Sequence, residues 1–179
     1  MRTPTLASAP LDLHTAWDQG VGIGAFIAGA SPDHRALWES IRRTHRPSPV
    51  ALTRRLPAGA RLLVIAADWC GDAVNTLPAL ATWAEETGVE LRIIDRDSCP
   101  EVMDHYLTHD TRAIPIVIIL DRELREIGHW GPRPAELQAW VIEHLLSLTK
   151  EERYKETRRW YARDRGEATI REVVAAVGG

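Results

Sequence analysis

Residues 62–80, LLVIAADWCGDAVNTLPAL, decide the fold of this chain. The segment opens with an apolar run, residues 62–67, whose length predicts a strand that is buried on both faces. Residues 68–72 interrupt the run. Apolar side chains then recur at helical spacing, at Val74, Leu77, Leu80, Ala81 and Ala84. Cys70 is therefore expected at the point where a buried strand ends and a helix begins.

Cys70 is the main candidate for chemistry. At a helix N-terminus the free N–H groups and the helix dipole favour an anion, which lowers the pKa of a thiol. Asp72 opposes this effect, because a carboxylate in the first turn repels the thiolate. We therefore expect a modestly lowered pKa and a reactive thiol that lies open to water. The alternative is a structural thiol, since free cysteine is among the most buried residue types.

The residues around Cys70 resemble the thioredoxin superfamily. Trp69-Cys70-Gly71 resembles the opening of the thioredoxin active site, and Pro78 falls where thioredoxins kink the helix that follows. Ile114-Pro115, ahead of an apolar run, resembles the cis-proline of that family and the strand it opens. The resemblance implies an α/β fold: a thioredoxin-like three-layer α/β/α sandwich with a mixed central sheet, plus N-terminal and C-terminal helical extensions.

A narrower resemblance links the chain to a bacterial group of thioredoxin family proteins that carry a Trp-Cys-Gly-Asp motif. It is carried by residues 68–72 (DWCGD), 103–107 (MDHYL), 130–136 (WGPRPAE) and 161–166 (YARDRG). The expected organisation is an N-terminal helical extension over residues 1–50, a thioredoxin-like domain over 51–148, and a C-terminal helical extension over 149–179 that packs on the domain.

The chain departs from dithiol thioredoxins in ways that bear on activity. Ala73 stands where dithiol members have their second cysteine, Asp72 replaces the proline, and Val64 replaces a buried acid. The resemblance therefore implies a monothiol mechanism, in which Cys70 forms a mixed disulfide with a protein or with a low-molecular-weight thiol. Without a resolving cysteine at position 73, an external thiol must release the product.

Several residues are candidates for substrate binding. If the Ile114-Pro115 bond is cis, as the resemblance implies, the backbone of Ile114 is free to pair with an extended substrate segment. Trp69, Gly71 and Asp72 complete the expected substrate-binding set. We expect Trp69 to be exposed beside the thiol. Asp68 and Trp130 are further candidates for the recognition surface. Asp68 is expected to be solvated at the strand end, and the alternative for Trp130 is that it covers the sheet edge.

Cys99 is a possible resolving cysteine. It follows a second apolar run, residues 91–95, and the carboxyl ends of neighbouring parallel strands meet at one edge of a sheet. A bridge between Cys70 and Cys99 requires Cα atoms within about 7 Å of each other. The alternative is an incidental thiol at a loop-to-helix junction. His105 and His109 have i, i+4 spacing, but a solvated helix face explains them, so we expect neither a metal nor a cofactor.

The remaining segments complete the expected order of elements. Strands are predicted at 114–120 and 124–130, and helices after Ser31, after Cys70, after Cys99 and after Gly131. Residues 51–57 fit either a strand or a helix. The glycine-rich segment 20–24 is interpreted as a flexible turn that packs against the domain rather than as a phosphate loop. Residues 150–165 and 170–177 predict two helices that fold back on the domain or form a homodimer contact.

Bulk properties exclude several classes of function. A net charge of −3 over 179 residues with no basic block argues against nucleic-acid binding. The longest apolar stretch, residues 114–120, is too short to span a membrane, and the N-terminus lacks a secretory apolar region. A chain with only two cysteines fits the reducing cytoplasm better than a disulfide-stabilised secreted domain. Three hypotheses remain: a monothiol oxidoreductase, a Cys70–Cys99 redox switch, and a redox-inactive binding or scaffold module.

Overall fold

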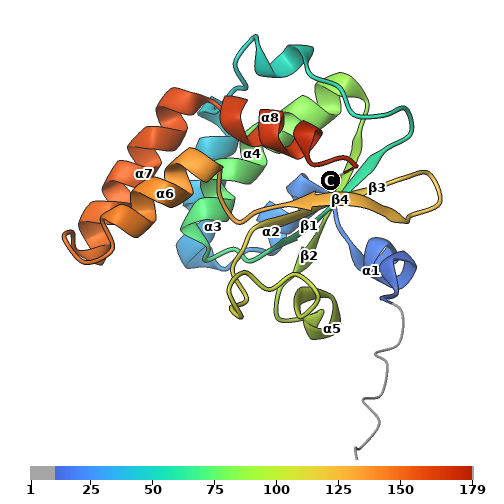
Figure 1. Cartoon of the computed structure of the whole chain (residues 1–179), viewed down its shortest axis with the longest axis horizontal. Coiled ribbons are helices and arrows are strands. Elements are labelled where there is room, and N and C mark those ends of the chain that lie inside the picture. The colour runs from blue at the N-terminus through green and yellow to red at the C-terminus, as the bar shows by residue number, and fades with distance from the viewer. Residues whose placement is uncertain (1–10, 179) are drawn as a thin grey trace, which may run out of the picture.

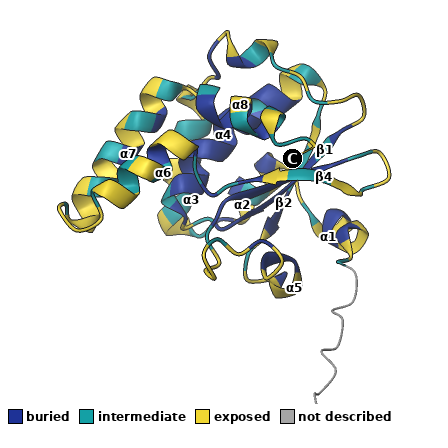
Figure 2. Cartoon of the chain, in the orientation of Figure 1, coloured by how far each residue is buried: buried dark blue, intermediate teal, exposed yellow. Residues whose placement is uncertain are grey.

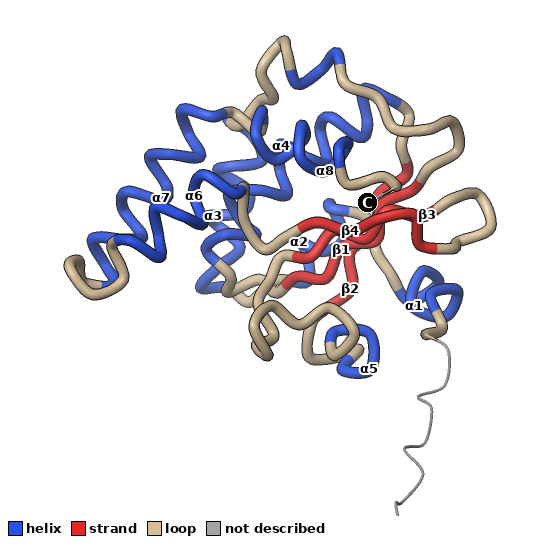
Figure 3. Tube along the Cα trace, in the orientation of Figure 1, coloured by secondary structure: helices blue, strands red, loops and turns tan. Residues whose placement is uncertain are grey.

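The central feature is a four-stranded mixed sheet, seen in a computed structural model that describes residues 11–178. The strands lie in the order β2-β1-β3-β4 and span Arg61–Ala66 (β1), Glu90–Asp95 (β2), Ile116–Leu120 (β3) and Glu126–Trp130 (β4). β1 is parallel to β2 and antiparallel to β3, and β3 is antiparallel to β4. Figure 3 shows the strands side by side in red. The buried runs predicted from the sequence are β1 and β3.

Helices cover both faces of this sheet. In Figure 1, α4 (Gly71–Thr87) and α8 (Glu167–Ala175) lie above it, and α1 (Leu13–Gln19) and α5 (Pro100–Met103) lie below it. This is the three-layer α/β/α arrangement of a thioredoxin-like fold, as expected. None of the helices within residues 11–178 has the length and apolar character that a bilayer crossing requires.

α4 is the central helix of the core. Twelve of its 17 residues are buried, and it ends at Gly88, whose φ of 73° is the left-handed conformation that glycine adopts without strain. α3 (Pro32–Thr44) packs along α4, and Arg42 Nη2 lies 2.7 Å from Glu85 Oε1 across this contact. Burying one large apolar side chain contributes about 1.5–3 kcal/mol, so the buried Val74, Leu77, Leu80 and Trp83 of this helix anchor the fold strongly.

The N-terminal segment adds to the edge of the sheet. Val21 forms an antiparallel bridge with Ile93 of β2, and α2 (Ile23–Gly29) begins directly after it. An ideal Cβ at Gly20 would lie 2.8 Å from the Cβ of Arg92, so a side chain there would force the two segments apart. Residues 20–24 therefore pack against the domain, as expected, but they form a bridge to β2 and the start of α2 rather than a flexible turn. The ambiguous segment 51–57 contains a short 3₁₀ helix, Ala51–Thr53.

The C-terminal segment folds back on the sandwich. α6 (Ala135–Glu143) leads into α7 (Lys150–Asp164), which starts with a capping box between Thr149 and Glu152. Both α7 and α8 contact α4, and Figure 2 shows that the outer faces of α6 and α7 remain exposed. The residue that caps the C-terminus of α8, Ala176, approaches β4 so closely that an ideal Cβ at Gly128 would lie 2.1 Å from its carbonyl oxygen. The homodimer and the domain boundaries stay predictions.

Candidate active site

Cys70 occupies the position that the sequence predicts. It follows β1 and is the N-cap residue of α4, where its Sγ accepts a hydrogen bond from the N–H of Ala73 at 3.4 Å. The thiol donates to the carbonyl oxygen of Ile114, also at 3.4 Å. The Ile114–Pro115 peptide bond is cis, as the resemblance implies. The fold therefore brings the thiol and the cis-proline loop into direct contact.

The environment of the thiol differs from the expectation. Cys70 is only 7% exposed, and burial raises its pKa above the ordinary value. The N–H of Ala73 lowers the pKa, the charge of Asp72 raises it, and the charge of Arg133 lowers it, but burial has the largest effect. The expected modest lowering of the pKa and the expected open thiol are therefore wrong. The physical reason is that loss of water around the sulfur outweighs the helix N-terminus.

A cavity of about 230 Å³ gives access to the thiol. Arg96, Arg112 and Arg133 line it together with Trp69 and Tyr154. Trp69 is half exposed, as expected, and the guanidinium of Arg96 lies over its ring at 4.6 Å. Tyr154 reaches the cavity from α7. Each of the three arginines also forms an ion pair, Arg96 with Asp97, Arg112 with Asp104 and Arg133 with Asp72. The Cys70 cavity is therefore lined by paired guanidinium groups, and one wall comes from the C-terminal segment.

Asp72 joins three parts of the chain beside Cys70. Its side chain is buried, and its Oδ2 lies 2.6 Å from Arg133 Nη2 in the loop between β4 and α6. Its Oδ1 accepts a hydrogen bond of 3.2 Å from the hydroxyl of Tyr161 in α7. Burial raises the pKa of Tyr161 well above its ordinary value, so its hydroxyl stays a donor at neutral pH.

Sequence reasoning gave no role to Arg133 or Tyr161. Both lie in segments that resemble the Trp-Cys-Gly-Asp group, residues 130–136 and 161–166. A carboxylate in the first turn of a helix that follows a buried strand also requires a partner, because a buried charge without one is costly. These two signals together point to the network. The substrate-binding role of Trp69, Gly71, Asp72, Ile114 and Pro115 stays a prediction.

Asp68 and Trp130 do not line the Cys70 cavity. Asp68 was expected to be solvated, yet it is only partly exposed and its Oδ2 accepts a hydrogen bond of 2.7 Å from the N–H of Ser31. Trp130 is buried at the sheet edge, as the alternative for it predicts, and its Nε1 donates to Glu172 at 2.8 Å. Asp68 lines a second cavity instead, because the start of α3 docks against it.

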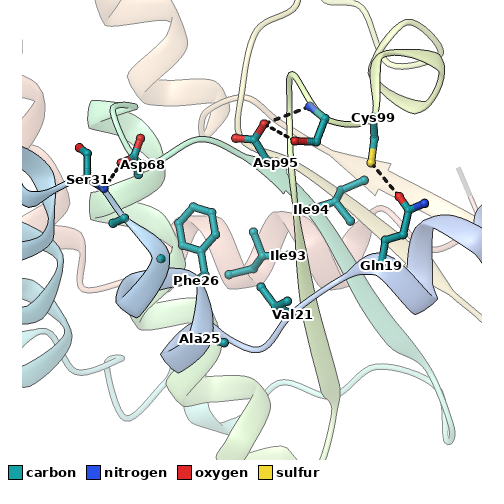
Figure 4. A pocket seen from close by; sticks show the side chains of 13 residues that line it. Gln19, Val21, Ala25, Phe26, Ser31, Asp68, Ile93, Ile94, Asp95 and Cys99 are labelled. Carbon is teal, nitrogen blue, oxygen red and sulfur yellow. Dashed lines mark hydrogen bonds between the residues drawn. The ribbon is translucent and has the colours of Figure 1, made fainter.

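Cys99 faces that second cavity, which has a volume of about 580 Å³. Cys99 is the N-cap residue of α5 and is buried, and its thiol donates to Gln19 Oε1 at 3.3 Å (Figure 4). Both cysteines are free thiols, and each has a different hydrogen-bond acceptor. A resolving role for Cys99 stays a prediction.

Within residues 11–178, no three His, Cys, Asp or Glu side chains lie close enough together to hold a metal ion. His109 has a φ of 48° and lies in a turn, so the predicted helical i, i+4 relation between His105 and His109 does not form. The helix expected after Pro100 is only four residues long, which explains the difference.

Comparison with known families places this site in context. A family model described as thioredoxin matches residues 23–163, which include Cys70, the cis-proline and Tyr161. The chain belongs to the thioredoxin family. No curated protein matches it.

Two solved structures share the thioredoxin-like fold of the chain. A protein of unknown function from Pseudomonas aeruginosa has a TM-score of 0.69 and 22% identity, and the match covers 91% of this chain and 98% of that one. An HIV epitope scaffold has a TM-score of 0.64 and 23% identity, with coverages of 89% and 96%. At these identities the likeness establishes the fold alone.

Proposed function

We propose that this thioredoxin-family protein is a thiol–disulfide oxidoreductase that uses Cys70 as its single nucleophile. The observation that carries the proposal is the contact of the Cys70 thiol with both the N-terminus of α4 and the carbonyl of Ile114, at the base of an arginine-lined cavity. Helix N–H groups and arginine side chains both stabilise a thiolate. Ala73 leaves no second cysteine in the helix.

The reaction proceeds by two exchanges. The Cys70 thiolate attacks one sulfur of the partner disulfide, a new S–S bond forms, and the other partner sulfur leaves as a thiolate. An external thiolate then attacks the partner sulfur of the mixed disulfide, and Cys70 leaves with the electron pair of the broken bond. The external thiol ends in a disulfide with the partner, and Cys70 returns to its starting state.

The charge of the Cys70 cavity indicates the kind of partner. Three arginines line it. Arg133 pairs with Asp72, the one carboxylate of the lining, and Arg96 and Arg112 pair with the exposed Asp97 and Asp104 outside it, which a partner's carboxylates can replace. An anionic partner is therefore favoured, either an acidic protein segment or a low-molecular-weight thiol with carboxylates. Two free cysteines in the chain also fit a reducing compartment such as the cytoplasm.

The test compares two disulfide probes on two variants. Cys99→Ser leaves only Cys70, and Cys70→Ser leaves only Cys99. We expect Cys99→Ser to form mixed disulfides with the anionic dithiobis(nitrobenzoate) and the neutral dithiodipyridine. The rate should rise with pH up to a midpoint above the ordinary thiol pKa of about 8.5, because burial raises the pKa of Cys70 and only the thiolate attacks.

A matched substitution tests the role of the arginines. Arg112→Ala in the Cys99→Ser background should slow the reaction with the anionic probe by about twofold to fivefold, and leave the neutral probe unchanged. Faster labelling of Cys70→Ser than of Cys99→Ser would contradict the choice of nucleophile. Turnover is then assayed with an acidic peptide disulfide and glutathione.

A second candidate function is a redox-inactive binding module. The burial of Cys70 and its raised pKa favour it, because both reduce the thiolate available at neutral pH. Under this hypothesis Cys70→Ala binds the partner with the same affinity as the unsubstituted protein. If Cys99→Ser reacts with neither probe at alkaline pH, the binding module is the better account.

A further inference from the structure

The cavity beside Cys99 is a large recess that the Cys70 chemistry does not use. Its walls come from α2 and β2 and are mainly apolar, with Phe26, Ile93 and Ile94 facing the space (Figure 4). Its volume of about 580 Å³ lies within the range of about 300–1,000 Å³ that is usual for small-molecule sites. It also lies at the carboxyl ends of the parallel strands β1 and β2, where α/β proteins commonly bind ligands.

The charged groups of this cavity are all acidic. Asp68 follows β1 and Asp95 ends β2, and Figure 4 shows both along one rim, above Phe26 and Ile93. No lysine or arginine lines the cavity within the part of the chain that is described. Burial alone would raise the pKa of Asp68, but its hydrogen bond from Ser31 contributes to a net lowering, so the carboxylate is ionised at neutral pH.

Each carboxylate has an oxygen available to a ligand. Asp68 Oδ2 accepts from the N–H of Ser31 and also lies 3.2 Å from Nδ1 of His34. Asp95 Oδ1 accepts from the N–H groups of Asp97 and Ser98, both at 3.0 Å. The second oxygens, Asp68 Oδ1 and Asp95 Oδ2, receive no hydrogen bond from residues 11–178. Two carboxylates at the rim of an apolar recess favour a cation and disfavour an anion.

We propose that the cavity beside Cys99 binds a small molecule that carries a protonated amine on an apolar body the size of an aromatic ring. The ammonium group lies at the rim between Asp68 and Asp95, and the apolar body contacts Phe26, Ile93 and Ile94. The apolar walls provide the burial, and the two carboxylates select the charge of the ligand. This site is separate from the Cys70 cavity, so the proposal does not depend on the redox function.

The experiment uses three probes of nearly equal size that differ in charge: phenethylamine, 2-phenylethanol and 3-phenylpropionate. Ligand-observed NMR measures the binding of each to the full chain at neutral pH. We expect the amine to bind with a Kd in the low millimolar range, about tenfold tighter than the alcohol, and the carboxylate not to bind. Equal binding of all three probes, or no binding of the amine, overturns the proposal.

Two glycines of α2 provide a matched pair of variants. Gly29 lines the cavity and Gly24 does not, and a Cβ added at either position meets nothing within 4 Å. Gly29→Leu should abolish amine binding and Gly24→Leu should retain it. Asp68→Asn keeps an acceptor for Ser31 and should weaken the amine by about fivefold without affecting the alcohol. Equal amine binding by the two leucine variants would overturn the site.

Discussion

The two cysteines of this protein have equivalent places in the fold and different surroundings. Each follows one of the two parallel strands and is the N-cap residue of the next helix. Three arginines and Asp72 line the cavity of Cys70, whereas Asp68 and Asp95 are the charged residues of the cavity beside Cys99. A strand-to-helix junction therefore places a thiol, and the loops and terminal helices packed around it determine its chemistry.

The two thiols also differ in what acts on their pKa. Burial is the largest effect at both and raises both pKa values. At Cys70 the N–H of Ala73 and the charge of Arg133 act in the opposite direction. At Cys99 the further effects come from Glu101 and Asp95, which raise the pKa again. Cys70 alone has groups around it that stabilise the thiolate.

The largest predicted effect concerns Trp38, which supports the segment shared by the two cavities. Trp38 is fully buried, and its Nε1 donates to the carbonyl oxygen of Asp68 at 2.7 Å. Trp38→Ala leaves a large void, so we expect a loss of about 3–5 kcal/mol in the free energy of unfolding, measured by urea denaturation. The neighbouring Leu37→Ala, at a 38% exposed position, should cost less than about 1 kcal/mol. Similar losses of unfolding free energy in Trp38→Ala and Leu37→Ala would contradict the supporting role of Trp38.

A smaller loss of stability is expected from Arg133→Ala, a substitution that should change the reactivity of Cys70 and not that of Cys99. The substitution leaves Asp72 buried without its ion pair, at a cost of about 2–3 kcal/mol, because the Arg133 side chain is itself 25% exposed. It should also raise the pKa of Cys70 further and leave the alkylation rate of Cys99 unchanged. Arg112→Ala, whose partner Asp104 is exposed, serves as the control and should leave stability essentially unchanged. A Cys70 alkylation profile that stays unchanged in Arg133→Ala would show that its charge does not reach the sulfur.

The smallest effects come from removing single carboxylate charges. Asp72→Asn should speed the alkylation of Cys70 at neutral pH by about twofold to fivefold, because the Asp72 charge raises the pKa of that thiol. Glu101→Gln should speed only Cys99, by about twofold. Rates are measured in the Cys99→Ser and Cys70→Ser backgrounds. Each substitution serves as the control of the other. A faster alkylation of Cys99 in Asp72→Asn, or of Cys70 in Glu101→Gln, would show that the two thiols do not have independent surroundings.

Local sequence patterns predict most of the framework. The apolar runs of β1 and β3 identify buried strands, and the helical spacing after Cys70 identifies α4, because burial on both faces and a 3.6-residue period leave clear signals. The order of these elements then fixes the position of Cys70. The cis bond before Pro115 was predicted from the resemblance to thioredoxins, because sequence alone favours a trans bond.

The surroundings of the thiols could not be predicted in the same way. Tyr161 lies 89 positions from Asp72, and Gln19 lies 80 positions from Cys99. Such contacts depend on how the terminal helices dock, which no local period encodes. The error in the pKa of Cys70 has the same origin, because burial of the sulfur comes from tertiary packing. The acid-lined cavity was missed because the docking of residues 20–30 on β2 is also non-local.

The hydrogen bond from Tyr161 to Asp72 has a practical consequence for anyone who shortens this protein. A fragment that stops at residue 148 retains all four strands, α4 and Cys70, although it loses α7 and α8. It would lack the hydroxyl of Tyr161, which donates to Asp72 two residues after Cys70. Reactivity measured on such a fragment would describe a different thiol from the one in the whole chain.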